Sequence, residues 1–242
     1  GRTTIVYTPD ATASPNGWHR DGLNLYTNMR GNNVWAYPQE AGSSSSVTIE
    51  PDCGTDLDCV FPLDLTASSW SSDNFGAYTA SVFYWTNRIH DIAYLYGFTE
   101  TAGNLQMYNF GRGGRENDPL YVAIKSDLAA CGTVVAQSIG GVDGQIGMMQ
   151  MCGNDTYNPL RPSALGGFVV AHELYHQYTS RFIGGPNSSC YRTGPNGNLS
   201  EHVDFTAQLI FSTAADTAST KSATGTWIYI QSAGSNGVWT RC

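Results

Sequence analysis

The sequence predicts an α+β fold, in which a β-rich, irregular lobe is followed by a core of helices and strands. Two observations carry this prediction. Residues 1–79 hold short alternating or β-branched runs between clusters of Gly, Pro, Asn and Ser, a pattern typical of short strands and long loops. From Ala80 onward, long segments place apolar residues every three or four positions, which is typical of buried helices.

The length of 242 residues allows one sizeable core but not several independent domains. We therefore expect a single structural unit over residues 1–242, with the irregular lobe at 1–79 and the core at 80–242. Within the lobe, the runs at residues 3–7 and 46–49 are the strand candidates, because they combine alternation with β-branched side chains.

Three helices are predicted in the core. The first covers residues 80–97 and ends at Gly97, a residue common at helix C-termini because it tolerates a left-handed backbone. The second covers about 164–182 and stops before a Gly-Gly-Pro sequence, and the third covers about 198–212. Between the first two, residues 144–152 alternate enough to form a strand. The apolar positions that define the first helix are Val82, Phe83, Trp85, Ile89, Ile92, Ala93 and Tyr96.

The charge content and the hydropathy of the sequence each exclude one class of partner. Charged residues make up only 13% of the chain, against about 25% in an average soluble domain. The formal net charge of −8 repels a phosphate backbone, and no Lys/Arg cluster in the sequence opposes it, so nucleic acid is excluded as a partner. No stretch approaches the roughly 18 apolar residues of a membrane span, so no membrane contact is expected.

The cysteines and sequons favour the secretory route. Six cysteines occur together with few lysines and with Asn-x-Ser/Thr sequons at Asn154, Asn187 and Asn198. We therefore expect a secreted, extracellular glycoprotein. The first four residues lack the basic and apolar regions of a signal peptide, so we expect a processed chain. Six cysteines allow many pairings, and we favour local ones: Cys53–Cys59, Cys131–Cys152 and Cys190–Cys242.

An HExxH sequence, from His172 through Glu173 to His176, lies inside the second predicted helix. Positions i and i+4 share one helix face, so both imidazoles can reach one ion while Glu173 approaches its bound water. Zinc prefers nitrogen and oxygen ligands, and three protein ligands leave the fourth position for water. The pattern therefore predicts one zinc site, with Glu173 as the general base that takes a proton from the water attacking a peptide carbonyl. The alternative is a helix that holds two histidines and a glutamate at this spacing by chance, which is much rarer than a metal site with this sequence.

The third ligand decides the subclass of the site. A metzincin needs a Gly three residues and a His six residues beyond the second histidine, but Thr179 and Phe182 occupy these positions, so the metzincin subclass is excluded. The remaining candidates are Glu201 and His202, at the start of the third predicted helix. Glu201 has a competing role in a capping box with Asn198. We favour Glu201 because a return loop to an acidic residue on a second helix gives the His2Glu arrangement, and His202 remains the alternative.

Other polar residues are interpreted as structural. The adjacent His90 and Asp91 could carry acid-base chemistry, but a polar pair within the packing is favoured. Arg112 and Arg115 are expected to fix their glycine-rich loop, because no helix that could bind phosphate opens after it. The methionines at 148–151 are most simply core and strand residues.

Several separate motifs can be compared with known families. The motifs are Phe83-Tyr84-Trp85-Thr86-Asn87-Arg88-Ile89-His90-Asp91, Tyr96-Gly97-Phe98-Thr99-Glu100, Ala102-Gly103-Asn104, Asn109-Phe110-Gly111-Arg112-Gly113-Gly114, Asp143-Gly144-Gln145, the HExxH helix and Arg181 to Pro186. Together they resemble the fungalysin family of secreted fungal metallopeptidases, and they occur in the order of the family over roughly residues 15–210.

This resemblance implies a thermolysin-like zincin fold of the gluzincin type, with one zinc held by the two HExxH histidines and Glu201. It implies that Glu173 is the catalytic glutamate and that Asp204 supports a zinc histidine. It also implies that residues 144–151 form an edge strand along which substrate backbone lies. The side chains expected to contact substrate there are Met148 and Met149. The implied function is a monomeric zinc endopeptidase acting on extracellular proteins or peptides, and calcium binding is left open.

The sequence departs from the family in two ways. Asp204 lies three residues after Glu201 instead of four, which still keeps both on one helical face. The sequence stops at Cys242, where similar proteins continue as a helical lobe, so we expect a truncated C-terminal lobe, an open cleft and weak peptidase activity. The alternatives are a weak or inactive zinc-binding pseudoprotease that binds peptides or a partner protein through the open cleft, and a fragment of a longer protein.

Overall fold

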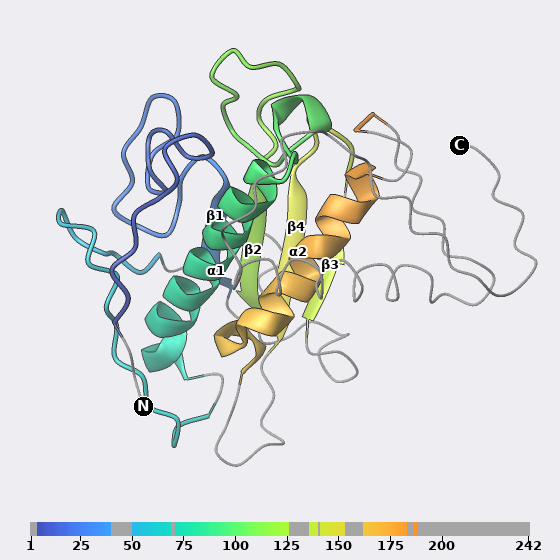
Figure 1. Ribbon diagram of the computed structural model, residues 1–242. Coiled ribbons are helices and arrows are strands. Elements are labelled where there is room, and N and C mark those ends of the chain that lie inside the picture. Colours follow the sequence, from blue (N-terminus) through green and yellow to red (C-terminus); the bar gives the residue numbers. More distant parts are fainter. Residues whose placement is uncertain are drawn as a thin grey trace, which may run out of the picture.

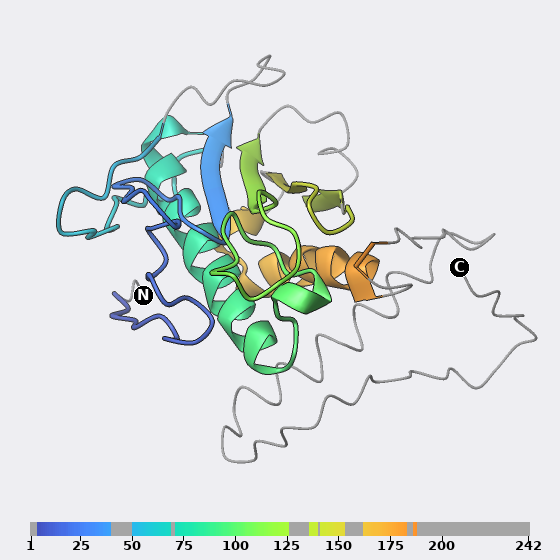
Figure 2. The same cartoon turned by 90° about the horizontal axis from the view of Figure 1, so that it is seen from above.

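Two long helices lie against one face of a small sheet in the part of the chain that the structure describes, as both views in Figure 1 and Figure 2 show. This combination of a sheet and helices confirms the predicted mixture of helices and strands, while the thermolysin-like arrangement stays a prediction. The structure is a computed structural model that describes residues 4–39, 50–68, 71–125, 136–139, 141–152, 162–182 and 186–187.

The sheet has four strands within the described residues, in the order β1-β2-β4-β3. Strands β1 (Val34–Gln39), β2 (Leu120–Lys125) and β4 (Gly147–Cys152) are parallel, and β3 (Ala136–Ile139) is antiparallel to β4. The strand predicted over 144–152 is thus confirmed. Its predicted place at the sheet edge is wrong, because β4 pairs with a neighbour on each side and β3 occupies the edge. Strand order depends on pairing between distant segments, which alternation along one segment does not reveal.

Helix α1 (Phe75–Leu95) starts earlier than Ala80, where the sequence predicted it. Phe75 and Tyr78 are buried and extend the apolar face of the helix by more than one turn. The sequence prediction missed this first turn, because the glycine at position 76 has a low helix propensity. A Cβ at Gly76 would lie 2.5 Å from the Phe61 ring, so the glycine admits that ring against the helix. The predicted stop is confirmed, since Gly97 has a φ of +106° just beyond the helix.

Helix α2 (Gly167–Phe182) follows a short 3-10 helix at Ser163–Leu165 and ends where the sequence predicted. Its first residue is a glycine for a steric reason. A Cβ at Gly167 would lie 2.6 Å from the Trp85 ring of α1, so the two helices approach closely at this point. The third predicted helix, over residues 198–212, lies outside the described residues.

The N-terminal region is less regular than predicted. Residues Thr4–Tyr7 form no strand, so the prediction of one at 3–7 is wrong, and the run at 46–49 lies outside the described residues. Val6 is 96% exposed, and Tyr7 packs instead on Trp18, with ring centroids 4.5 Å apart. Among the described residues, the alternating run has no neighbouring strand to pair with, and pattern alone cannot supply one. In the described part of 1–79, β1 is the one strand, beside isolated bridges. The division of the chain at residue 79 stays a prediction.

The core lies between the sheet and the two helices. The β4 methionines Met149 and Met151 have no exposed surface, and they pack in one cluster with Val82 of α1 and Leu174 of α2. This placement confirms a core role for both methionines. The structure also contains the predicted Cys53–Cys59 disulfide. Cys152 is disulfide-bonded too. The other predicted disulfide residues, Cys131, Cys190 and Cys242, lie outside the described residues.

Candidate metal centre

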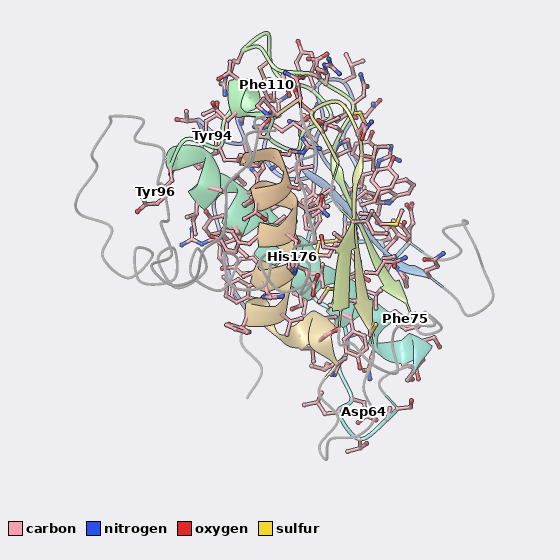
Figure 3. The ribbon with its side chains drawn as sticks, turned by 90° about the vertical axis from the view of Figure 1, so that its right-hand side faces the viewer. Asp64, Phe75, Tyr94, Tyr96, Phe110 and His176 are labelled. Carbon is pink, nitrogen blue, oxygen red and sulfur yellow. A yellow bond between two sulfur atoms is a disulfide. The ribbon has the colours of Figure 1, made fainter. Side chains whose placement is uncertain are left out.

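The two histidines of HExxH converge on one face of α2. His176 lies near the middle of the helix, beside the strands (Figure 3). The Nε2 atoms of His172 and His176 are 3.1 Å apart, and their rings are nearly perpendicular, at 86°. The ligand atoms of these histidines and Glu173 all lie within 4.8 Å of one another. Glu173 is 5% exposed and His176 8%, whereas His172 is half-buried, so the cluster is open to solvent only on the side of His172.

This geometry fits a metal ion. Two Zn–N bonds of about 2.0–2.1 Å at a tetrahedral angle place their nitrogens about 3.3 Å apart, close to the observed separation. Two imidazoles and a carboxylate form a donor set suited to zinc, whereas calcium prefers oxygen ligands throughout. Within the described ranges, this is the one group of three His, Cys, Asp or Glu side chains arranged to hold a metal. The described residues thus contain one group arranged to hold a metal, and no cluster of three carboxylates suited to calcium.

The structure brings together three of the predicted site residues, His172, Glu173 and His176. Glu201, the alternative ligand His202 and the supporting Asp204 lie outside the described residues, at 201–204. The predicted substrate residues lie on β4. Met149 is fully buried, whereas Met148 is half-buried. A contact between either methionine and a substrate stays a prediction.

The comparisons with known proteins bear directly on this cluster. The family described as fungalysin metallopeptidase (M36) matches residues 1–238 of this chain. The chain belongs to the fungalysin family. The resemblance seen in the separate sequence motifs is thereby confirmed over almost the whole sequence.

Individual relatives of this fungalysin are named extracellular metalloproteinase 3. The protein of Trichophyton tonsurans is 35% identical over 229 residues, which make up 94% of this chain and 36% of the relative. The protein of Arthroderma gypseum is 36% identical over the same shares. A relative from Trichophyton soudanense is 35% identical, with 58% of its length matched. The chain therefore spans about a third of the length of the first two relatives.

Neither helix of the described part is long and apolar enough to cross a membrane.

Near its C-terminal end, the HExxH helix α2 is anchored by a buried arginine. Arg181 and its partner Asp118 have side chains with no exposed surface, 2.7 Å apart. Sequence reasoning missed this pair, because a basic residue in the last turn of a helix is usually solvated. The guanidinium also donates to three carbonyl oxygens, those of Gly103 (2.8 Å), Asn104 (3.0 Å) and Gln145 (2.8 Å).

The His90-Asp91 pair on α1 plays a structural part, as interpreted from the sequence. His90 Nδ1 lies 3.2 Å from Asp91 Oδ1. The Asp91 carboxylate also accepts hydrogen bonds from the Asp10 backbone N–H, the Ser14 hydroxyl and the Trp18 indole. Burial raises the pKa of Asp91, but the hydrogen bond and charge of His90, with the bonds from Ser14 and Trp18, outweigh burial and lower it. The cluster ties the N-terminal segment to α1.

The glycine-rich loop is held by Arg112, in agreement with its predicted role. Its Nη1 donates to the Thr12 carbonyl at 2.7 Å and to the Tyr94 hydroxyl at 2.9 Å, and it lies 3.5 Å from Glu100. Arg115 contributes its backbone N–H, which donates to Asp143. These contacts leave Arg112 engaged with the protein rather than presented to an anion.

Proposed function

We propose that this chain is a zinc-dependent endopeptidase in which His172 and His176 hold the ion and Glu173 acts as general base. One observation carries the proposal. Two imidazole nitrogens converge to 3.1 Å, with the Glu173 carboxylate in a cluster whose ligand atoms lie within 4.8 Å of one another. Membership of a metallopeptidase family supports the same chemistry.

The zinc ion, when bound, supplies the Lewis acidity that makes water nucleophilic near neutral pH. Glu173 follows His172 directly, so the helix presents its carboxylate next to the ligand face. It takes the proton as water attacks the peptide carbonyl and can pass that proton to the leaving amine. Because Glu173 is only 5% exposed, the medium around it is less polar than water, which strengthens its electrostatic interactions.

Glu201 completes the proposed ligand set, and Asp204 is proposed to orient one of the histidines. A carboxylate as third ligand would leave one coordination position for water and substrate. The support for Glu201 over His202 is the resemblance to the fungalysin family, which implies a glutamate as the third ligand at this position. The names of the relatives favour a peptidase over the alternative of a non-catalytic peptide-binding protein.

The proposed substrates are extracellular proteins and peptides, and the proposed location is outside the cell. The names of the relatives support both. Asn187, which opens a sequon, is exposed in a turn shortly after α2, as an acceptor of N-linked glycan must be. Secretion, glycosylation at this residue and a monomeric state belong to the proposal.

The test measures metal content and hydrolysis together in the same chain. We expect one zinc per molecule by elemental analysis, and casein cleavage that a chelator abolishes and added zinc restores. His172→Ala should weaken zinc affinity by at least about 100-fold. A chain that binds zinc but cleaves nothing would overturn the peptidase proposal and leave the pseudoprotease.

A matched pair of neighbours tests the third ligand. Glu201→Gln should weaken zinc binding strongly, because the amide is a poorer ligand than a carboxylate, whereas His202→Ala should leave it unchanged. The reverse result would assign the third position to His202.

A further inference from the structure

A buried glutamine connects the HExxH helix to the edge strand. Gln177 directly follows His176 and has no exposed surface. Its side-chain Nε2 donates to the hydroxyl oxygen of Ser138 on β3 and, at 3.1 Å, to the backbone carbonyl of Met148 on β4. One amide group of α2 thus bonds to two adjacent strands of the sheet.

The orientation of this amide follows from its partners. The carbonyl of Met148 can only accept a hydrogen bond, so the amide nitrogen must face it and Oε1 must point elsewhere. Ser138 then receives a hydrogen bond from Nε2 and keeps its own hydroxyl proton to donate. Because Ser138 pairs with Met149 and Ile139 pairs with Met148, both bonds of Gln177 fall on one short stretch of the β3–β4 ladder.

Gly147 makes room for the amide. A Cβ built at this residue would lie 2.5 Å from Gln177 Oε1 and 3.1 Å from Leu120 Cδ1. Both distances are shorter than ordinary van der Waals contact, so a side chain at 147 would displace the glutamine. Gly147 and Gln177 therefore form a matched pair, in which the missing side chain of one permits the buried position of the other.

Gln177 also lies one helical turn after Glu173, at the i+4 position of the same face. Figure 1 shows β3 beside α2, and the two elements are in contact. In the described chain β3 pairs only with β4, and an edge strand held by one neighbour is prone to shift. A hydrogen bond from the helix fixes such a strand relative to the helix as well as to the sheet.

We propose that Gln177 is a positioning residue, which holds edge strand β3 at a fixed distance from the Glu173 face of α2. The proposal rests on the proposed peptidase function. If a peptide substrate adds to β3 as a further strand, the position of its scissile carbonyl relative to Glu173 depends on where β3 lies. Loss of the Gln177 bonds then weakens productive binding of substrate, while the ion and its ligands stay in place.

The first experiment replaces the amide by an apolar side chain of similar size. Gln177→Met should raise amide hydrogen exchange in residues 136–139 by about tenfold, corresponding to one or two net hydrogen bonds. It should raise KM for peptides about fivefold to tenfold, with kcat within about twofold and zinc content unchanged. Ser138→Ala removes one of the two bonds and should give a smaller change of the same kind, which keeps the test open if Gln177→Met folds poorly.

Thr179→Val is the matched control. Thr179 is also buried on α2, but its hydroxyl lies within hydrogen-bonding distance of the Tyr175 and His176 carbonyls of the same helix and bonds to none of the described strands. This variant should leave exchange in β3 and KM unchanged. Equal changes in both variants would show a general loss of packing and would overturn the proposal.

A double variant tests the matched pair. Gly147→Ala should displace the amide and reproduce the effects of Gln177→Met, and the Gly147→Ala/Gln177→Ala double variant should be no worse than Gly147→Ala alone. Exchange in 136–139 that stays at the wild-type rate in Gln177→Met would overturn the proposal. If the wild-type chain cleaves no peptide, the peptidase proposal fails, and hydrogen exchange still supports or overturns the link between α2 and β3.

Discussion

A histidine directly followed by an acid occurs on each of the two packed helices, His90-Asp91 on α1 and His172-Glu173 on α2, and the two pairs differ in what surrounds them. Around Asp91, three groups from the N-terminal segment and the imidazole of His90 donate to one carboxylate. Around Glu173, a second histidine one turn further on brings its Nε2 to 3.1 Å from that of His172. A histidine next to an acid therefore does not define a functional site by itself. The groups around the pair decide its role: hydrogen-bond donors to Asp91 in one case, and the second histidine beside His172 in the other.

The strongest test of this contrast is Glu173→Gln. The glutamine has nearly the same shape but cannot take a proton from water, so we expect kcat to fall by about 10³-fold. Zinc content and the free energy of unfolding should stay close to wild type, because the two histidines are untouched. Wild-type cleavage of casein by this variant would show that Glu173 is not the base.

The next largest effect is expected for Arg181→Met, which tests whether α2 also contains a purely structural polar group. Removing the guanidinium leaves the Asp118 carboxylate buried without its ion-pair partner, so unfolding should become easier by about 3–5 kcal/mol in urea titrations. The Arg181→Met/Asp118→Asn double variant should lose less than the sum of the two single losses. Additive losses would mean that the two side chains act independently.

Asp91→Asn breaks the structural pair on α1. In the wild-type chain, hydrogen-bond donors face both carboxylate oxygens of Asp91. In the variant, an NH2 group replaces one of these oxygens and cannot accept, so we expect a loss of about 2 kcal/mol in unfolding free energy. Zinc affinity and kcat/KM per folded molecule should not change. A drop in kcat/KM without a loss of stability would place Asp91 in the reaction and remove the contrast with Glu173.

The sequence predicted the parts of the site that depend on local spacing. HExxH is set by residues four apart on one helix, and the ends of both long helices near Gly97 and Phe182 follow from local signals as well. The convergence of His172 and His176 therefore needed no knowledge of the rest of the fold.

The parts that the sequence did not predict depend on distant partners. The order of β3 and β4 is set by strand pairing, and the start of α1 depends on how Phe61 packs over Gly76. Arg181 and Gln177 are polar residues whose burial is stable only because they hydrogen-bond to Asp118 and Ser138, respectively. A polar residue in a helix pattern is normally assigned to solvent, which is why both were missed.

The smallest expected effect concerns Asp21, a carboxylate that is satisfied like Asp91 but by groups nearby in sequence. Its oxygens accept hydrogen bonds from the backbone N–H groups of Leu23 and Asn24 and from the Tyr26 hydroxyl. Burial raises the pKa of Asp21, but the bond from Tyr26 and those from Asn24 and Leu23 outweigh burial and lower it to about 2.

Because the pKa of Asp21 is lower in the folded chain than its ordinary value of 3.8, its charged form stabilises the fold. That stabilisation is complete above about pH 4 and is lost as the pH falls through about 2. We expect Asp21→Asn to cost about 1 kcal/mol at pH 7, after allowing for solvent screening, and almost nothing below about pH 2. Urea titrations of both proteins at several pH values measure this difference. A cost that stays constant from pH 7 to 2 would show that the hydrogen bonds of Asp21 do not depend on its charge.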